Sequence, residues 1–502
     1  MTTYKNLVLA IFNSTWSALI AFCLIPVYVN YLGIETYAII SLYVTLNLIL
    51  QIFDFGIYPT LIRKTAQNLN QKSDNKFEKT VQNFLIVNIF VSFIIFVSFI
   101  AFSDFFALTW LNKTIIPFET VSNSIMLIGI LIAIRWPILI FQAILFGSNF
   151  AKPAFIINIL MVSFNAIGAL ILIILLSANI EQFFIWQIFS SGIYTITIFK
   201  ICKKKTNINF WGKFNFSDLK NSLRLSYQLW LVTASGILIT QVDKLILSNL
   251  LSLDKFGIYM LAASSAAILQ IIINPFYTIF YPKFSKLYNE NNIKEICHLY
   301  GTLVKSLSSV LLPIGLFIII SSEFLLFIWT GDKNLSSLIA PVFNLLLVAS
   351  VLNGITYLPY IIQLSFGKNW IPFLINIFFT IVNIPLLIIS VEWYGFLGGG
   401  IVLLFNQIII FFMNPILIKK YVSDKMLIKN YIYSTGIPML TFLFGTVIYY
   451  LFLKILIINH YQAFFIGLIL LLSTSIINIV FFKETRNIFF IVLNYIFFIR
   501  KK

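Results

Sequence analysis

The sequence predicts an all-α integral membrane protein with about 14 transmembrane helices, arranged as two six-helix lobes in a parallel repeat plus two C-terminal helices. Three observations predict this class: long apolar segments, a large difference in positive charge between alternate connecting segments, and an internal repeat. A chain that is 60% hydrophobic and only 10% charged cannot bury its apolar surface in a water-soluble domain of this length. Much of that surface is therefore expected to face lipid.

The apolar segments have the length that a membrane span requires. A helix that crosses the hydrocarbon core satisfies its own backbone hydrogen bonds and needs about 20 mostly apolar residues. Segments of this kind occur at 7–30, 37–62, 82–103, 122–146, 154–176, 182–199, 226–250, 257–281, 302–321, 339–363, 372–391, 399–418, 431–453 and 461–482. The first is too long for a cleavable signal and is expected to remain as helix 1. The shorter apolar tail at 488–499 is expected to lie along the inner membrane surface.

Positive charge predicts the orientation of these spans. Of the 34 Lys and Arg residues, 28 fall on one side of the spans, four on the other and two inside them. Because short loops rich in Lys and Arg stay in the cytoplasm, both termini are expected there. A basic soluble protein would suggest nucleic acid, but here the charge lies beside membrane ends. Anionic membrane lipids, and not nucleic acid, are the expected partners.

The sequence lacks the residues that a disulfide scaffold, a metal site or an ATPase would need. Cys23, Cys202 and Cys297 are too few and too separated for a disulfide scaffold. His298 and His460 fall in loops on opposite sides, and no cluster has metal-ligand spacing, so neither a metal nor another cofactor is expected. The chain also has no GxxxxGK[ST] pattern for ATP hydrolysis. These observations favour secondary transport over an enzyme.

An internal repeat relates the two halves of the chain. A shift of 219 residues pairs Glu35 with Asp254, Gln51 with Gln270, Tyr58 with Tyr277, and Lys64 with Lys283. At a shift of 218, Asn158 pairs with Asn376 and Asn165 with Asn383. Six spans separate equivalent positions, and because six is even, both halves point the same way through the bilayer. Parallel repeats of this kind occur in transporters that bind substrate between two lobes.

The repeat predicts the domain organisation. Residues 1–199 form the N-terminal lobe with helices 1–6, and residues 225–420 form the C-terminal lobe with helices 7–12. Between them, residues 200–224 form a basic cytoplasmic linker. Residues 421–502 hold helices 13 and 14 and the interfacial tail, outside the repeat.

Short motifs near helix ends carry a family resemblance. They are Ile25-Pro26-Val27-Tyr28 running into Tyr31-Leu32-Gly33-Ile34-Glu35-Thr36-Tyr37, Asp54-Phe55-Gly56-Ile57 followed by Arg63, Gln241-Val242-Asp243-Lys244 leading to Phe256-Gly257-Ile258-Tyr259, and Pro275 with Tyr281-Pro282. With the six-plus-six-plus-two arrangement, the chain resembles the Wzx-type flippases that move O-antigen and capsule repeat units, in the multidrug, oligosaccharidyl-lipid and polysaccharide exporter superfamily. Each motif alone is short and degenerate.

The resemblance implies a function that composition and spacing do not show. It implies transfer of an undecaprenyl-pyrophosphate-linked oligosaccharide from the cytoplasmic to the outer leaflet by alternating access, coupled to H⁺ or Na⁺. A polysaccharide polymerase and a chain-length regulator are the protein partners that it implies.

Three alternatives remain open. A cation-coupled multidrug exporter of the same superfamily should have acidic residues deep in both lobes, but the second lobe offers only Asp243. A lipid II flippase is closer, and substrate competition would separate it. A membrane glycosyltransferase or polymerase needs catalytic groups in a large outer segment, and the longest one, 104–121, holds only Asp104, Lys113 and Glu119.

Four ionisable side chains fall inside the predicted spans: Asp54, Arg135, Asp243 and Lys244. A charge there costs about 2.5–3.5 kcal/mol on insertion scales, so each needs a partner or a water-filled cavity. Arg135 lies about 15 Å from either interface, and its planar guanidinium suits two phosphate oxygens. The structural alternative for Arg135 is a partnership with Asp54 or with a backbone carbonyl.

The other three charges have competing interpretations. Lys244 either binds substrate phosphate or reaches the outer interface, about 9 Å away. Because adjacent helix positions point about 100° apart, Asp243 and Lys244 are not expected to pair simply by adjacency. Asp243 is expected to bind the coupling ion or to neutralise Arg135. Asp54 is expected to take the same coupling role, or to bond a helix end or Arg63.

Amide side chains inside the spans could bind sugar hydroxyls without adding charge. The candidates for substrate binding are Gln51, Gln270, Asn158 and Asn376. The structural alternative for each is an interhelical hydrogen bond, worth about 0.6 kcal/mol on average.

Overall fold

The computed structural model describes residues 2–68, 75–111, 114–148, 150–206, 208–212, 214–419, 425–455 and 460–481. All regular secondary structure in these ranges is helical. Twelve segments are long and apolar enough to cross a membrane, and two shorter apolar stretches, Ser434–Ile448 and Phe464–Ser475, lie in the last two helices. The all-α membrane class is confirmed, and these fourteen segments correspond to the predicted spans. The predicted interfacial tail at 488–499 lies outside the described residues.

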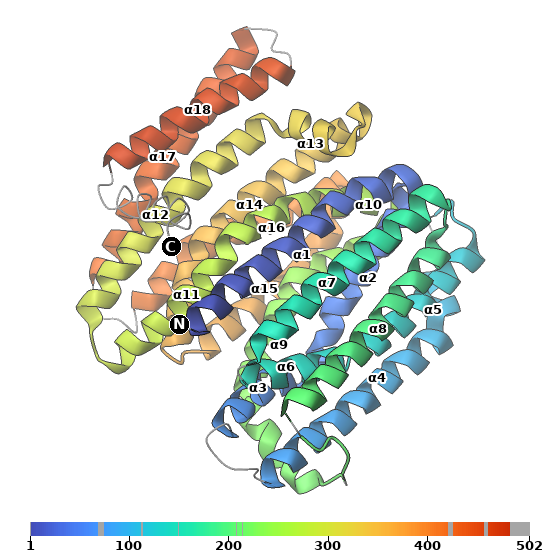
Figure 1. Cartoon of the computed structure of the whole chain (residues 1–502). Coiled ribbons are helices and arrows are strands. Elements are labelled where there is room, and N and C mark those ends of the chain that lie inside the picture. The colour runs from blue at the N-terminus through green and yellow to red at the C-terminus, as the bar shows by residue number, and fades with distance from the viewer. Residues whose placement is uncertain are drawn as a thin grey trace, which may run out of the picture. The chain divides into compact units, whose positions relative to one another are not determined.

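The helices follow one another with short connections (Figure 1). In chain order they are α1 (Thr2–Leu32), α2 (Ile34–Leu50), the 3-10 helix η1 (Gln51–Asp54), α3 (Ile57–Asn68), α4 (Asn75–Thr109), α5 (Phe118–Arg135), α6 (Ile138–Gly147), α7 (Ala151–Leu170), the π-helix η2 (Ile171–Leu175), α8 (Ile180–Thr206), α9 (Phe216–Leu250), α10 (Leu253–Ala266), the 3-10 helix η3 (Ala267–Leu269), α11 (Gln270–Asn289), α12 (Ile293–Ile320), α13 (Ser322–Thr330), α14 (Lys333–Ser365), α15 (Trp370–Tyr394), α16 (Leu397–Lys419), α17 (Lys425–Ile455) and α18 (His460–Phe481).

Contacts between helices group the chain into two compact units. Unit 1 comprises Met1–Met260 and Phe373–Phe396, and unit 2 comprises Leu261–Pro372 and Leu397–Lys502. The lobes deduced from the repeat, with their boundary at 200–224, remain a prediction. The residues proposed as a site from the sequence lie in unit 1, with the exception of Gln270.

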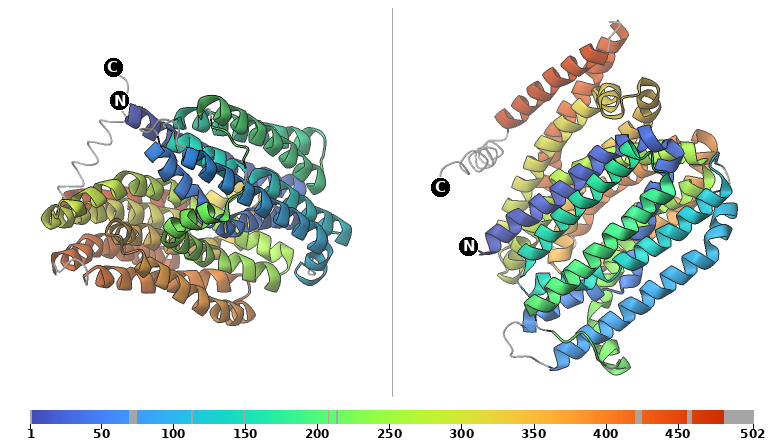
Figure 2. Two further views of the ribbon diagram at one scale, coloured as in Figure 1. Left: turned by 90° about the horizontal axis from the view of Figure 1, so that it is seen from below. Right: turned by 45° about the vertical axis from the view of Figure 1, so that its right-hand side comes forward.

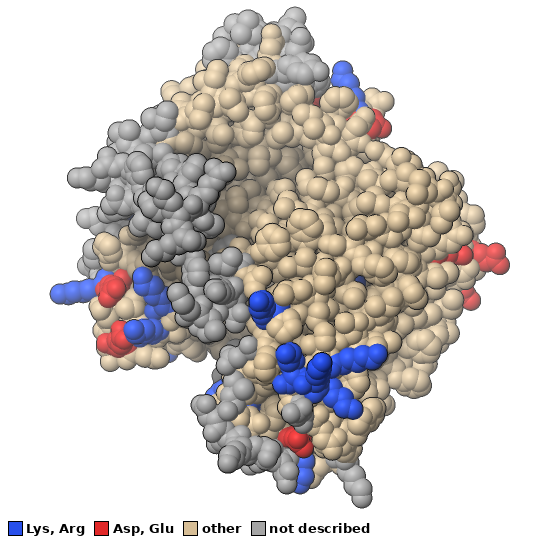
Figure 3. All heavy atoms as spheres, in the orientation of Figure 1, with Lys and Arg blue, Asp and Glu red and all other residues tan. Residues whose placement is uncertain are grey.

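In unit 1, α8 packs against α5 and α7, and α5 also packs against α4 (Figure 2). α8 has an acidic first turn with Glu181 and a basic last turn with Lys203, Lys204 and Lys205. Figure 3 shows the same separation on the surface, with Lys and Arg gathered where α8 ends and acidic residues where it begins. The two ends of this helix therefore carry opposite charge, as the predicted topology requires.

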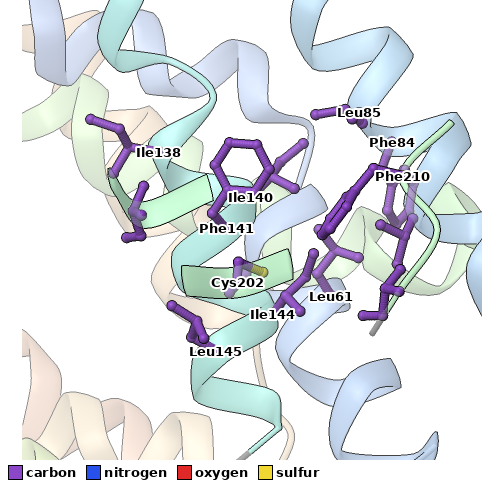
Figure 4. Close-up of a cluster of buried hydrophobic side chains, with 14 of the residues drawn as sticks. Leu61, Phe84, Leu85, Ile138, Ile140, Phe141, Ile144, Leu145, Cys202 and Phe210 are labelled. Atoms are coloured by element: carbon purple, nitrogen blue, oxygen red, sulfur yellow. The ribbon is translucent and has the colours of Figure 1, made fainter. Parts of the chain in front are cut away.

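A buried apolar cluster lies at the lysine-rich end of unit 1 (Figure 4). It includes Leu61 of α3, Phe84 of α4, Ile144 of α6 and Cys202 of α8, and the segment after α8 adds Phe210. Lipid tails are as apolar as these side chains, so close packing and not exclusion of water holds the helices together within the spans. Phe210 lies outside any span, and its removal from water contributes about 1.5–3 kcal/mol.

Two predicted spans are broken in the middle. The span expected at 37–62 ends its first part at Asp54, because Phe55 and Gly56 take left-handed backbone conformations, with φ of 50° and 74°. The span expected at 122–146 is interrupted at Trp136 and Pro137, where proline has no amide hydrogen for a helical bond. Both breaks place polar residues at helix ends inside the membrane region.

The span expected at 257–281 is interrupted too, and the position bears on the repeat. η1 begins at Gln51, and η3 ends directly before Gln270, the residue that the repeat pairs with Gln51. Both halves therefore change from α to 3-10 geometry at nearly equivalent positions in their second helix.

Unit 2 contains a short helix, α13, that was not expected from the sequence. It ends at Gly331, which has a left-handed φ of 76°. The Asp332 side chain then accepts hydrogen bonds from the backbone N–H groups of Asn334 and Leu335 and so caps α14. A glycine at the end of one helix and an aspartate cap at the start of the next are local signals. They can define a short helix that has no long apolar segment.

Candidate functional site

Arg135 lies at the break between α5 and α6, in the middle of the fourth predicted span. Its Nη1 donates a hydrogen bond of 2.7 Å to the hydroxyl of Tyr43 on α2. The Tyr43 ring in turn packs edge-on against Phe184, with 6.2 Å between ring centroids. Neither partner suggested by the sequence, Asp54 or a backbone carbonyl, is the one observed.

No carboxylate of the described residues forms an ion pair with Arg135. Within the described part of the chain, the ion pairs are Lys244 with Asp243 and Lys286 with Glu290, and neither includes Arg135. A tyrosine hydroxyl can orient a guanidinium, but it supplies no negative charge. The site is therefore electrostatically suited to an anion.

A hydrogen-bond network in unit 1 joins four helices, α1, α6, α7 and α8. The hydroxyl of Tyr194 on α8 accepts a hydrogen bond of 2.8 Å from Nε2 of Gln142 on α6. The same hydroxyl donates to Oδ1 of Asn158 at 3.1 Å, and Nδ2 of Asn158 donates to Oδ1 of Asn13 at 2.8 Å. Asn158 thus belongs to this network, whereas the hydrogen bond of Arg135 is to Tyr43.

Sequence reasoning missed Tyr43, the partner of Arg135, and Tyr194, which joins the network of Asn158. With 23 tyrosines in the chain, composition could not single them out. Their role depends on which helices pack together, and spacing along one helix does not show it.

Asp243 and Lys244 do pair, and the expectation that adjacent positions would keep them apart was wrong. Nζ of Lys244 lies 3.1 Å from Oδ1 of Asp243, and it also donates to the backbone oxygen of Thr240 at 2.7 Å. The flexible four-carbon stem of lysine bends back over the helix and bridges the angle between neighbouring positions. Tyr259 of α10 completes the cluster by donating its hydroxyl proton to Asp243.

This pairing changes the interpretation of Asp243 and Lys244. Asp243 is fully buried, at 0% exposure, and the Lys244 side chain is 19% exposed. Asp243 neutralises Lys244, and not Arg135 as the sequence suggested. Arg135 and the ion pair form two separate polar clusters within unit 1.

Asp54 lies where η1 ends. Its Oδ2 accepts a hydrogen bond of 3.0 Å from the backbone N–H of Tyr58, in the first turn of α3. Its Oδ1 is buried and has no hydrogen-bond partner among the residues that the structure describes. The bond to a helix end is the arrangement observed, and one carboxylate oxygen remains available to a proton or a cation.

The two predicted asparagines occupy equivalent places in their repeats. Asn158 bonds to Asn13 in the first helix of its half, and Nδ2 of Asn376 donates to Oγ of Ser235 in helix α9, the first of the other half, at 3.3 Å. Each bond joins the fifth helix to the first. This correspondence supports the duplication, and both bonds are interhelical.

The two glutamines lie in different units. Gln51 begins η1 in unit 1, and Gln270 begins α11 in unit 2; both are half-buried. Their assignment to substrate binding stays a prediction.

Metal ligation finds no support within the described ranges. No group of three or more His, Cys, Asp and Glu residues there could hold a metal ion. Within the described residues no disulfide joins the three cysteines: Cys202 and Cys297 are buried, and Cys23 is exposed.

Solved structures with the same fold are membrane transporters. One, described as the inward-facing conformation of a multidrug resistance MATE family transporter of the MOP superfamily, matches with a TM-score of 0.70 at 15% identity. It covers 82% of this chain and 96% of its own. Another, the lipid II flippase MurJ in an inward closed conformation, matches with a TM-score of 0.68 at 14% identity and covers 96% of this chain and 98% of its own. At these identities the likeness concerns the fold.

Sequence relatives point to polysaccharide synthesis. A Shigella flexneri protein named "Putative O-antigen transporter" is 28% identical over 160 residues, which span 32% of this chain and 37% of that protein. The alignment thus covers little more than a third of this relative. The family model described as "Polysaccharide biosynthesis protein" matches residues 4–288, which is more than half of the chain. The resemblance to Wzx-type proteins is thereby confirmed, and the chain belongs to the polysaccharide biosynthesis protein family.

Proposed function

We propose that the protein is a flippase that moves an undecaprenyl-pyrophosphate-linked oligosaccharide from the cytoplasmic to the outer leaflet by alternating access. Membership of the polysaccharide biosynthesis family and the transporter fold support the general class. The observation that carries the specific proposal is Arg135, a mid-membrane cation with a neutral partner. The substrate head group would supply the missing negative charge.

The chemistry of a pyrophosphate head group fits this position. A phosphate has several oxygens that accept charge-assisted hydrogen bonds, and a guanidinium can donate two parallel ones. One Arg135 nitrogen donates to Tyr43, which fixes the plane of the group and leaves other N–H donors for a ligand. Transfer of a charged head group through hydrocarbon without such donors would carry the full desolvation cost.

The network beyond Arg135 is suited to sugars. Tyr194, Gln142 and Asn158 present hydroxyl and amide groups without net charge. These groups can exchange partners among themselves and a hydroxyl-rich ligand, because each both donates and accepts hydrogen bonds. The prenyl tail would stay in lipid while the head group passes between the two lobes.

Asp54 is the stronger candidate for coupling to H⁺ or Na⁺. Its Oδ1 is buried without a partner in the described region, whereas both oxygens of Asp243 are already bonded to Lys244 or Tyr259. A buried carboxylate oxygen of this kind gains most from a proton or a small cation. Lys244, held by Asp243, is a weaker phosphate ligand than the sequence suggested.

The separation of charge along unit 1 supports a cytoplasmic position for the lysine-rich end of α8. With this orientation, both termini lie in the cytoplasm of a bacterium and the chain resides in the inner membrane.

Flipping of a fluorescent lipid-linked oligosaccharide in proteoliposomes tests the proposal. Arg135→Gln should slow flipping by about 10- to 100-fold, the equivalent of losing a charge-assisted hydrogen bond worth about 1.5–3 kcal/mol. Arg135→Lys keeps the charge and should be intermediate, and Tyr43→Phe controls for loss of the hydroxyl alone. Wild-type flipping by Arg135→Gln would refute the phosphate role. Preferential transport of lipid II in competition, or of cationic drugs, would assign the protein to one of the alternative classes.

A further inference from the structure

The segment between α8 and α9, residues 208–215, is here called the connector; residue 213 lies outside the described part. It is packed against the buried apolar cluster at the lysine-rich end of unit 1 (Figure 4). Ile208 and Phe210 are buried, and the Phe210 ring centroid lies 5.8 Å from that of Phe141 and 5.6 Å from that of Phe199. The connector therefore has an apolar side that fits into the helices.

Hydrogen bonds from α4 fix the backbone of the connector. Nε2 of Gln82 donates to the backbone oxygens of Asn209 at 2.9 Å and of Trp211 at 3.1 Å. Oδ1 of Asn83 accepts from the backbone N–H of Asn215 at 2.8 Å. Both ends of the connector are thus bonded to one turn of α4, and the side chains between them have a defined direction.

Three large apolar side chains point away from this packed side. Trp211 is 69% exposed, Phe214 is 47% exposed and Phe216, the first residue of α9, is 69% exposed. Three exposed aromatic rings within six residues of a hydrogen-bonded backbone form an apolar patch. Patches of this kind mark contacts with a protein or with a membrane.

The depth of the patch favours the membrane. Residues 80–103 of α4 carry no charge and extend about 36 Å, slightly more than the hydrocarbon thickness of about 30 Å. Gln82 and Asn83, which hold the connector, lie within one turn of the end of that segment. On α8, Phe199 precedes Lys200, the first charge after the span. Two helices thus independently place the connector at the boundary between hydrocarbon and head groups.

The charge around the patch is complementary to one class of lipid. Lys203, Lys204 and Lys205 in the last turn of α8 are exposed, as are Lys79 and Lys220. Nζ of Lys205 lies 5.7 Å from the ring centroid of Phe150. Exposed lysines in the segments next to exposed tryptophan and phenylalanine side chains match the head groups and upper acyl chains of anionic phospholipids.

We propose that the connector is a membrane-surface anchor. Trp211, Phe214 and Phe216 insert among the head groups of the leaflet on the lysine-rich side, and Lys203, Lys204 and Lys205 bind anionic phospholipid. The identity of this leaflet as the inner one rests on the orientation in the proposed function; the insertion itself does not. The anchor would tie the ends of α8 and α9 to the bilayer surface.

Fluorescence quenching in vesicles tests the insertion. Cys23, the exposed thiol, is replaced by serine, since Cys202 and Cys297 are buried. A single cysteine labelled with nitrobenzoxadiazole then replaces Trp211, Phe214 or Phe216 in phosphatidylglycerol/phosphatidylethanolamine vesicles. Nitroxide near the head group should quench all three labels and aqueous iodide should not. A label in Lys204→Cys should respond to iodide, and one in Phe93→Cys, at an exposed position on α4, to a nitroxide at mid-chain.

The opposite result overturns the proposal. If iodide quenched the labels at the three aromatic positions as strongly as the label at 204, the patch would face water. It would then be a candidate binding surface for a soluble protein and not a membrane anchor. Labelling of Lys204→Cys by an impermeant maleimide from outside intact cells would instead refute the orientation, and leave the measured depth unaffected.

A second measurement tests the choice of lipid. Addition of phosphatidylglycerol should raise the Tm of the detergent-solubilised wild-type protein. The triple variant Lys203→Gln, Lys204→Gln, Lys205→Gln should need about fivefold more lipid per lysine removed for the same rise. Lys255→Gln, at an exposed position on α10, should behave as wild type. Equal responses of the triple variant and the wild type would overturn the role of these lysines.

Discussion

The pair of Asp243 and Lys244 allows a test that separates structural from transport roles. Replacement of Lys244 by methionine would leave the fully buried Asp243 carboxylate with Tyr259 as its remaining observed side-chain partner. Breaking a buried ion pair by removal of one partner costs about 3–5 kcal/mol. Because the Lys244 side chain is 19% exposed, part of the pair is screened, and we expect a loss near the lower end, about 3 kcal/mol.

The double variant Asp243→Asn, Lys244→Met removes both charges and should lose less than about 1 kcal/mol, since replacement of a whole buried pair is often neutral. Steric-trap unfolding in bicelles would measure both variants and the single Asp243→Asn variant, and so complete a double-mutant cycle. The expected coupling energy is about 2–3 kcal/mol. A Lys244→Met variant within about 0.5 kcal/mol of wild type would show that the pair contributes nothing measurable.

The same double variant reports on ion coupling. If the pair is structural, the double variant should flip lipid-linked oligosaccharide at the wild-type rate in proteoliposomes. A stable double variant that no longer responds to a proton or Na⁺ gradient would assign the coupling role to Asp243, against the argument for Asp54.

Four further variants test the packing, the hydrogen-bond network and the coupling group. Gly129→Ala should destabilise the protein by about 1–3 kcal/mol in the same unfolding assay, because the added Cβ would lie 2.0 Å from Cβ of Phe99. Gly192→Ala, in α8 with no atom within 4 Å of an added Cβ, should instead be neutral or stabilising by up to about 1 kcal/mol. Asn158→Leu should cost only about 0.6 kcal/mol of stability, and a large loss of flipping at that small cost would assign the amide to substrate. Asp54→Asn keeps an acceptor for its helix end but cannot titrate, so unchanged gradient dependence of flipping would exclude it as the coupling group.

Much of the fold could be predicted from sequence, because membrane spans obey one strong rule. Each span must be about 20 apolar residues long, and this rule alone predicts fourteen segments that the structure reproduces as long helices or as two shorter apolar stretches. The breaks were not predicted. Pro137 and Phe55 are both apolar, so the hydropathy of the segment does not fall at either position and gives no sign of the break.

The candidate site was predicted in part, for a related reason. Charges inside spans are costly, and this cost alone identified Arg135, Asp54, Asp243 and Lys244. Their partners depend on which helices pack together. Tyr43 could be recognised as the partner of Arg135 only after α2 and α5 were placed, and the reach of Lys244 back to Asp243 depends on a side-chain rotamer.

The matching bonds from Asn158 to Asn13 and from Asn376 to Ser235 carry a historical implication. A common ancestor of about half the present size would have had the same hydrogen bond between its first and fifth helices before any gene fusion. A chain that crosses the membrane an even number of times ends on the side where it began. Two such ancestors could therefore insert in the same orientation and be joined by a loop. Gene fusion would then have required no change in the membrane orientation of either copy. Each copy could afterwards diverge in its polar residues while it kept the hydrogen bond between its first and fifth helices.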